Sequence, residues 1–214
     1  MKLYGYFRSS AAYRVRIALA LKDLPHETVF VHLTRDGGEQ KQPSYRAVNP
    51  QALVPTLEHD GHAIGQSLAI IAYLDEIKPE PAFLPREAAA RARVRQIAYA
   101  IACDIHPLNN LRVLGALRSR FGADDAAVND WYRHWIAEGF TAIESLLANG
   151  RDTGTFCHGE TPTLADICLI PQVANARRFE VDLAAFPTIV RIDAAARALP
   201  AFKAAAPENQ PDAA

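Results

Sequence analysis

The chain has 214 residues, 50% hydrophobic and 22% charged, which suffices for one large domain or two small ones around ordinary globular cores. Its net charge of −1 gives no electrostatic case for binding nucleic acid or an acidic membrane. No apolar run approaches the roughly 20 residues that span a bilayer, and the N-terminus leads into a predicted strand without a signal peptide. Three scattered cysteines cannot form a disulfide framework. We therefore expect a soluble cytoplasmic protein.

The first informative segment is a junction between a predicted strand at residues 3–6 and an apolar helix that continues through residues 17–22. Ser9 and Ser10 fall at this junction, where hydroxyl groups suit N-cap positions. The first N–H groups of a helix lack intrahelical partners, and the helix dipole favours a negative charge such as a thiolate. Because no cysteine lies in this segment, such a thiolate must arrive with a ligand. The simpler interpretation is that both serines only cap the helix.

The next elements predict a small mixed sheet. Residues 27–33 form a second strand, and its helix-length connection to the first predicts a parallel βαβ unit. A helical patch around Tyr45 follows. Residues 53–57 are interpreted as an edge strand, because Pro55 cannot donate to a ladder and the Val54 backbone must face something other than a neighbouring strand.

A fourth strand at residues 62–64 and an apolar helix at 68–74 complete this part. Ser67 is placed as the N-cap of that helix. It either only caps the helix or, with the helix N–H groups, also binds a carboxylate. The order βαβ then ββα is the thioredoxin-like arrangement, so we predict an α/β domain at residues 1–78.

Three prolines within residues 79–85 predict a stiff linker, and the periodicity of residues 86–214 predicts an all-α domain. We expect a kink at Pro107. Trp131 and Trp135 are expected in the core.

Two further features concern the ends of this helical part. Thr163 and Asp166 have the spacing of a capping box that opens a helix over 167–176. The polar tail from Pro207 is expected to fray.

The remaining candidates for chemistry are the cysteines and the arginines near predicted helix ends. The cysteines are predicted to be packing residues, and the adjacent Cys157 and His158 lack a second ligand pair, so we predict no metal site. Arg177 and Arg178 end the helix opened by the capping box, where complementing the helix dipole is the simplest role. Arg14 and Arg16, near the start of the first helix, oppose its dipole, so another contact must hold them, most simply at a domain or dimer boundary.

Arg8-Ser9-Ser10 followed by Tyr13-Arg14-Val15-Arg16-Ile17-Ala18-Leu19 resembles the opening motif of zeta-class glutathione transferases, which include maleylacetoacetate and maleylpyruvate isomerases. The family pattern has Ser-Ser-Cys where this chain has Ala11 in third position. The resemblance runs over nearly the whole chain, including Asp166 and residues 179–183. It implies a thioredoxin-like glutathione-binding domain at 1–78, a linker and a helical substrate-binding domain at 86–214, in a cytoplasmic homodimer.

The resemblance also implies roles for individual residues. Ser9 or Ser10 donates to the glutathione sulfur, Val54–Pro55 is a cis bond whose backbone pairs with the cysteinyl part, and Gln66 and Ser67 bind the γ-glutamyl carboxylate. The implied glutathione contacts are Ser9, Ser10, Arg14, Gln40, Val54, Pro55, Gln66, Ser67, His106 and Asn110. The implied substrate contacts are Arg8, Arg112 and Arg178, of which Arg8 and Arg178 join the two serines as catalytic residues.

The implied activity is glutathione-dependent cis–trans isomerisation of a maleyl keto-diacid in aromatic amino acid catabolism or other aromatic degradation. Thiolate addition makes the double bond single, rotation follows, and elimination regenerates glutathione. Two alternatives stay open. A broader transferase would conjugate glutathione to halogenated acids or other electrophiles, and a non-catalytic interaction protein would keep the scaffold but lose thiol activation.

Overall fold

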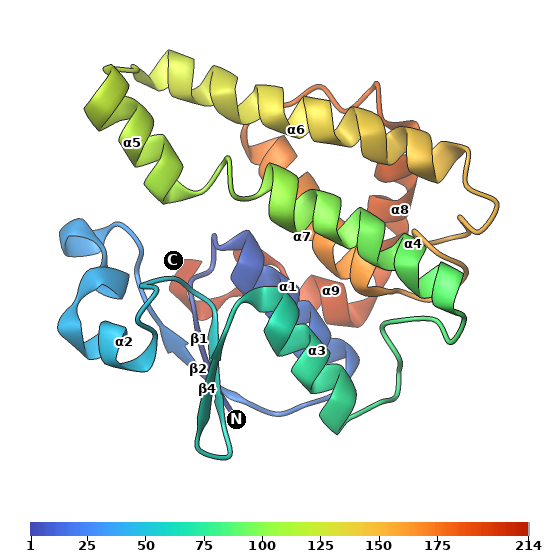
Figure 1. Ribbon diagram of the computed structural model, residues 1–214, viewed down its shortest axis with the longest axis horizontal. Coiled ribbons are helices and arrows are strands. Elements are labelled where there is room, and N and C mark those ends of the chain that lie inside the picture. The colour runs from blue at the N-terminus through green and yellow to red at the C-terminus, as the bar shows by residue number, and fades with distance from the viewer. Residues whose placement is uncertain (214) are drawn as a thin grey trace. The chain divides into compact units, whose positions relative to one another are not determined.

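The computed structural model describes residues Met1–Ala213 and divides into two compact units. The first unit contains Met1–Ala82 and the residues from Leu199 onward, and the second contains Phe83–Ala198 (Figure 1). This grouping differs from the predicted ranges 1–78 and 86–214, because the last segment packs with the first unit. The assignment of glutathione binding to one domain and substrate binding to the other stays a prediction.

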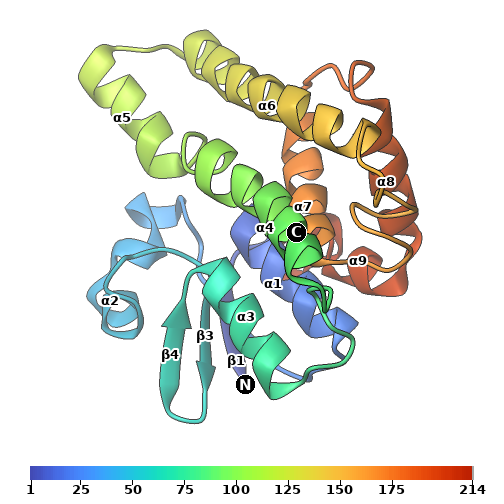
Figure 2. The same ribbon diagram turned by 45° about the vertical axis from the view of Figure 1, so that its right-hand side comes forward.

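The first unit is built on a four-stranded mixed sheet in the order β2-β1-β3-β4. Strand β1 pairs in parallel with β2 and antiparallel with β3, which pairs antiparallel with β4. Helices α1 and α3 pack against each other beside this sheet (Figure 2). The elements are β1 (Lys2–Gly5), α1 (Ser10–Leu21), β2 (Glu27–Phe30), α2 (Pro43–Val48), β3 (Thr56–His59), β4 (His62–Gly65) and α3 (Ser67–Ile77). The predicted thioredoxin-like order is confirmed.

Two strand predictions need correction. The second strand ends at Phe30 and does not reach residue 33. The predicted edge strand at 53–57 is wrong, because β3 begins only at Thr56 and lies between β1 and β4. Pro55 therefore precedes an internal strand, where its missing N–H removes no ladder bond.

The segment from Leu199 returns to the first unit through α9 (Pro200–Ala205), which packs on α1 and buries Phe202 completely. Arg16 Nε donates to the Ala205 carbonyl at 2.9 Å, and the Phe7 N–H donates to Asp212 Oδ2 at 3.0 Å. Burial lowers the pKa of Arg16 to about 10. The tail does not fray as predicted, since it forms short 3-10 turns up to residue 213. The hydrogen bond to the Ala205 carbonyl is thus a contact that holds Arg16 near the start of α1, against the helix dipole.

Lys22 fastens the start of the predicted linker to the first unit. Its fully buried ammonium group lies 2.8 Å from Asp75 Oδ1 and donates to the Lys78 carbonyl at 2.5 Å and the Pro81 carbonyl at 2.9 Å. A buried ammonium group is stable only with such partners, so this lysine fixes the path of the chain that leaves α3.

The second unit is a helical assembly in which α7 packs among α4, α6 and α8. The helices are α4 (Ala88–Tyr99), a π-helical turn (Ala100–Ile105), α5 (Leu111–Phe121), α6 (Asp125–Ala148), α7 (Leu164–Arg178) and α8 (Pro187–Ala198). Pro107 does not kink a continuous helix as predicted. The helix stops after the π-helical turn, and α5 restarts with Asn110 as its N-cap.

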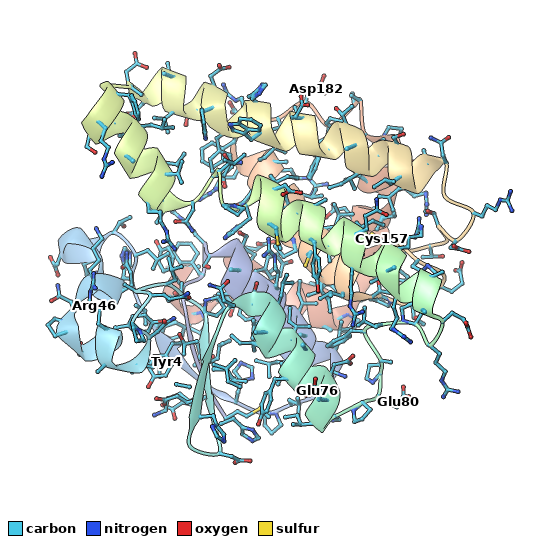
Figure 3. The ribbon with its side chains drawn as sticks, viewed as in Figure 1. Tyr4, Arg46, Glu76, Glu80, Cys157 and Asp182 are labelled. Atoms are coloured by element: carbon cyan, nitrogen blue, oxygen red, sulfur yellow. The ribbon has the colours of Figure 1, made fainter. Side chains whose placement is uncertain are left out.

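The predicted capping box is confirmed at the start of α7. Asp166 is completely buried and accepts from the Thr163 N–H at 2.7 Å and hydroxyl at 2.8 Å through Oδ2. Its Oδ1 accepts from the N–H of Cys157, a residue labelled in Figure 3, at 2.8 Å. Burial raises the pKa of Asp166, an increase that these hydrogen bonds partly offset. One carboxylate thus ties the loop before α7 to the helix itself.

Two predictions about packing hold only in part. Cys157 and Cys168 are buried, but Cys103 is exposed. Trp131 and Trp135 are only half-buried and contact each other edge to face, with 5.5 Å between ring centroids.

Within residues 1–213, no helix is long and apolar enough to cross a membrane, and no three His, Cys, Asp or Glu side chains are grouped to hold a metal ion.

Candidate functional site

Ser9 is the N-cap of α1, with extended backbone angles of −71° and 112°. Its Oγ accepts from the Ala12 N–H at 3.2 Å. A hydroxyl that accepts one hydrogen bond still has its own proton to donate, so capping and donation to a sulfur are compatible. Ser10 is the first residue of the helix and is 6% exposed. Ser9 is half-buried and Ser10 is buried, so Ser9 is the more accessible of the two serines at the N-terminus of α1.

Arg14 and Ser67, both predicted to contact glutathione, lie together in the structure. Arg14 is 1% exposed and its Nη1 donates to Ser67 Oγ at 3.4 Å. Ser67 is the first residue of α3, whereas the predicted N-cap position belongs to Gln66. The guanidinium cation and the positive end of the α3 dipole thus lie side by side. This arrangement favours the binding of an anion such as a carboxylate.

Gln66 joins β4 to α3 in an unusual backbone conformation, with φ 65° and ψ 115°. Non-glycine residues rarely adopt positive φ, and such positions cluster at functional sites. Its amide donates from Nε2 to Gln51 Oε1 at 2.8 Å. The exposed Gln66 side chain thus lies beside the buried Ser67.

Gln40 follows β2 and is 8% exposed. Its Nε2 donates to the Leu33 carbonyl at 3.1 Å, while its buried Oε1 accepts no hydrogen bond within the described part of the chain. A buried acceptor without a partner costs free energy, so this atom fits the amide or ammonium group of a bound peptide.

The Val54–Pro55 peptide bond is cis, as the resemblance implies. Sequence reasoning missed the side chains that support this loop. Tyr45 Oη donates to the Leu53 carbonyl at 2.7 Å, and Asn49 Nδ2 donates to the same carbonyl at 2.9 Å. Both side chains also bond Thr56 Oγ1 at 2.9 Å. Burial raises the pKa of Tyr45. The only sequence signal was Asn49 before a proline, which is typical of a turn.

In the second unit, His106, Asn110 and Arg112 lie in and after the turn between the π-helical turn and α5. Asn110 Oδ1 accepts from the Arg112 N–H at 3.1 Å as a helix cap, and the Arg112 side chain is exposed. Trp131 holds this turn, because its Nε1 donates to the Leu108 carbonyl at 2.9 Å.

The other two arginines lie on different elements. Arg178 is the last residue of α7, exposed, with its guanidinium carbon 4.7 Å from the Phe179 ring centroid. Arg8 precedes α1 in the first unit and lies 4.9 Å over the Phe7 ring. Ser9, Gln40, Val54 and Ser67 thus belong to the first unit, whereas Arg112 and Arg178 belong to the second. The convergence of the three arginines on one substrate stays a prediction.

Comparison with known proteins defines the class. A family model for the N-terminal domain of glutathione S-transferases matches residues 3–82. A solved structure described as holo maleyl pyruvate isomerase, a bacterial zeta-class glutathione S-transferase, has a TM-score of 0.97 and 50% identity over 100% of both chains. A maleylacetoacetate isomerase from Methylobacterium extorquens, solved with malonate and glutathione, has a TM-score of 0.96 and 42% identity over 100% of both chains. The fold is that of a glutathione S-transferase.

Curated relatives narrow the group. The chain is 50% identical to a maleylpyruvate isomerase of Ralstonia, over 100% of both chains. It is also 50% identical to the maleylacetoacetate isomerase of Pseudomonas aeruginosa, over 99% of this chain and 98% of the relative. The chain therefore belongs to the maleylacetoacetate and maleylpyruvate isomerase family of zeta-class glutathione transferases.

Proposed function

We propose that this protein is a glutathione-dependent cis–trans isomerase of a maleyl keto-diacid, either maleylacetoacetate or maleylpyruvate. The observation that carries the proposal is a capping Ser9 hydroxyl with a proton to donate, in a chain 50% identical over its full length to a maleylpyruvate isomerase. The direct test incubates purified protein and glutathione with each diacid and follows loss of the cis enol absorbance. No loss with either diacid would contradict the proposal.

The described residues fit glutathione. Arg14 and Ser67 at the α3 N-terminus suit its γ-glutamyl carboxylate, and the buried Gln40 Oε1 suits a donor of its peptide backbone. The Val54 backbone, with Pro55, Gln66, His106 and Asn110, completes the proposed set. When bound, glutathione supplies the thiolate that adds to the substrate double bond, allows rotation and leaves again.

The residues of the chain then have three tasks. Of the two serines, Ser9 is the one whose hydroxyl donates towards the sulfur and keeps the thiol ionised, assisted by the dipole of α1. Arg8, Arg112 and Arg178 bind the substrate carboxylates, for which a guanidinium offers two parallel donors. The same cations stabilise the negative charge that develops on the substrate.

Glutathione binding has its own prediction. Glutathione at about 100 times its dissociation constant should stabilise the native state by about 2.7 kcal/mol, measured as a rise in melting temperature. Ser67→Ala removes a hydroxyl proposed to contact a carboxylate, so glutathione binding should weaken by about 1–2 kcal/mol, measured by calorimetry. Ser145→Ala, at an exposed position of α6, is the matched control and should bind like the parent. Equal affinity in Ser67→Ala would remove Ser67 from the site.

The diacid assignment is tested at Arg178. Arg178→Lys keeps the charge but loses the two-pronged guanidinium, so kcat/KM for isomerisation should fall about ten- to hundredfold. Conjugation of a neutral electrophile by the same variant should be unchanged. Arg177→Lys is the matched control, because Arg177 lies at the same helix end and pairs with the buried Asp193 at 2.6 Å.

The outcomes separate the alternatives. If both activities fall together, Arg178 serves glutathione or the fold. If neither falls, Arg178 does not bind the diacid, and its assignment to the substrate is wrong.

Family membership also supports a cytoplasmic homodimer as part of this proposal. The three free cysteines fit a reducing compartment. Sedimentation analysis of the purified protein tests the dimer, and a monomer at micromolar concentration would contradict it.

A further inference from the structure

Arg178 is exposed but its guanidinium is not left to move freely. Nη2 donates to Asn175 Oδ1 at 3.3 Å, and Asn175, one turn earlier in α7, is 7% exposed. The guanidinium carbon lies 4.7 Å from the Phe179 ring centroid. A cation over an aromatic face is attracted by the ring quadrupole. One hydrogen bond and one ring thus define where the cation lies.

The Phe179 ring is itself fixed by Tyr132 of α6. The two rings are stacked, with centroids 3.6 Å apart and an interplanar angle of 13°. Tyr132 is 4% exposed, so it forms a rigid base for the stack. Burial raises the pKa of the Tyr132 phenol, and its interaction with Arg178 offsets part of that increase. Arg178, Phe179 and Tyr132 therefore form one layered cluster.

The same turn of α6 holds two segments of the second unit. Trp131 Nε1 donates to the Leu108 carbonyl, and Asn109 Nδ2 donates to the Tyr132 carbonyl at 3.3 Å. Arg133 Nε donates to the Phe179 carbonyl at 2.6 Å. The turn thus fixes both the loop before Asn110 and the backbone that follows Arg178.

We propose that Asn175 and the Phe179–Tyr132 stack are positioning residues, which hold the Arg178 guanidinium in the orientation that receives a substrate carboxylate. This inference rests on the proposed function of Arg178. Its physical reason is that a free arginine side chain loses conformational entropy when it is ordered, and an arginine already held in place loses less on binding. The alternative is that the cluster only packs the end of α7.

The test is a double-mutant cycle on the glutathione-loaded protein, with malonate as a dicarboxylate probe and calorimetry as the readout. Phe179→Leu should weaken malonate binding about tenfold, raise KM for the diacid by a similar factor and leave conjugation of a neutral electrophile unchanged. Phe179→Tyr keeps the ring and should restore parent affinity. In an Arg178→Met background, Phe179→Leu should have no further effect, because there is no guanidinium left to position.

A matched control comes from a second aromatic pair in the same unit. Phe186 contacts Phe140 edge to face at 5.6 Å and is 5% exposed. Phe186→Leu should lower the melting temperature at least as much as Phe179→Leu without weakening malonate binding. Asn175→Ala should weaken malonate binding in the same Arg178-dependent way as Phe179→Leu.

Two results would overturn the proposal. If Phe179→Leu weakens malonate binding equally with and without Arg178, or not at all, the cluster only packs the helix end while the proposed function stands. If the parent binds glutathione but neither binds malonate nor isomerises a diacid, the proposed function fails and the positioning role fails with it.

Discussion

Ser9→Ala is expected to lower kcat/KM for isomerisation by about 100- to 1,000-fold, the loss seen when one donor to a developing or full negative charge is removed. Ser9 Oγ already accepts the Ala12 N–H, so its proton has no role in the cap and is available to the sulfur. Without this donor, the pKa of bound glutathione thiol should rise. The 240 nm thiolate absorbance, followed against pH, measures that shift directly.

Three variants separate activation from capping. In Ser9→Ala, the loss of the helix cap should lower the free energy of unfolding by about 1 kcal/mol, and this loss by itself does not change the thiol pKa. Ser9→Thr retains both the acceptor and the donor and should recover most of the activity. Ser10→Ala, at the next position, should titrate like the parent. A parent-like thiolate titration in Ser9→Ala would show that the serine only caps α1.

Asp166→Ala is expected to lower the free energy of unfolding by about 3–5 kcal/mol, because it leaves several buried donors without an acceptor. The Thr163 N–H and hydroxyl and the Cys157 N–H all donate to this carboxylate. Each buried donor left unpaired costs about 1–3 kcal/mol. The variant no longer has to bury a charged carboxylate, and this gain offsets part of the loss in unfolding free energy. Urea unfolding at equilibrium measures the change.

Asp124→Ala is the matched control for this variant. Asp124 is the N-cap of α6 and accepts the Ala127 N–H at 2.8 Å, but unlike Asp166 it is exposed and ties no other segment to its helix. Its loss should cost about 1 kcal/mol, the usual range for an exposed cap. If both variants lose the same amount, burial adds nothing to the capping box and the accounting above is wrong.

Features with short-range causes were predictable from the sequence. The Thr163–Asp166 box, the serines at the start of α1 and the succession of strands and helices along the first unit all follow from neighbouring residue types. Residue roles in glutathione and substrate binding came from family resemblance rather than from the pattern of residues, and they stay predictions.

Long-range contacts were not predictable. The bond between Arg16 and the Ala205 carbonyl joins residues 189 positions apart, and no local pattern marks it. The fixing of the Leu53 carbonyl by Tyr45 and Asn49 depends on how a loop closes. The stacking of Tyr132 on Phe179 depends on how two helices pack. Proline at position 55 was misread because the one-residue difference between entering a strand and lying within it has no sequence signal.

The return of α9 to α1 has a consequence for biosynthesis. Chains emerge from the ribosome N-terminus first, and domains generally fold as units during synthesis. The second unit is one continuous stretch, Phe83–Ala198, so all its residues emerge before Leu199 does. The first unit, although synthesised earliest, lacks the partner of Arg16 and the cover of α1 until residues 200–205 have emerged. The half of the protein that is translated first is therefore the half that is completed last.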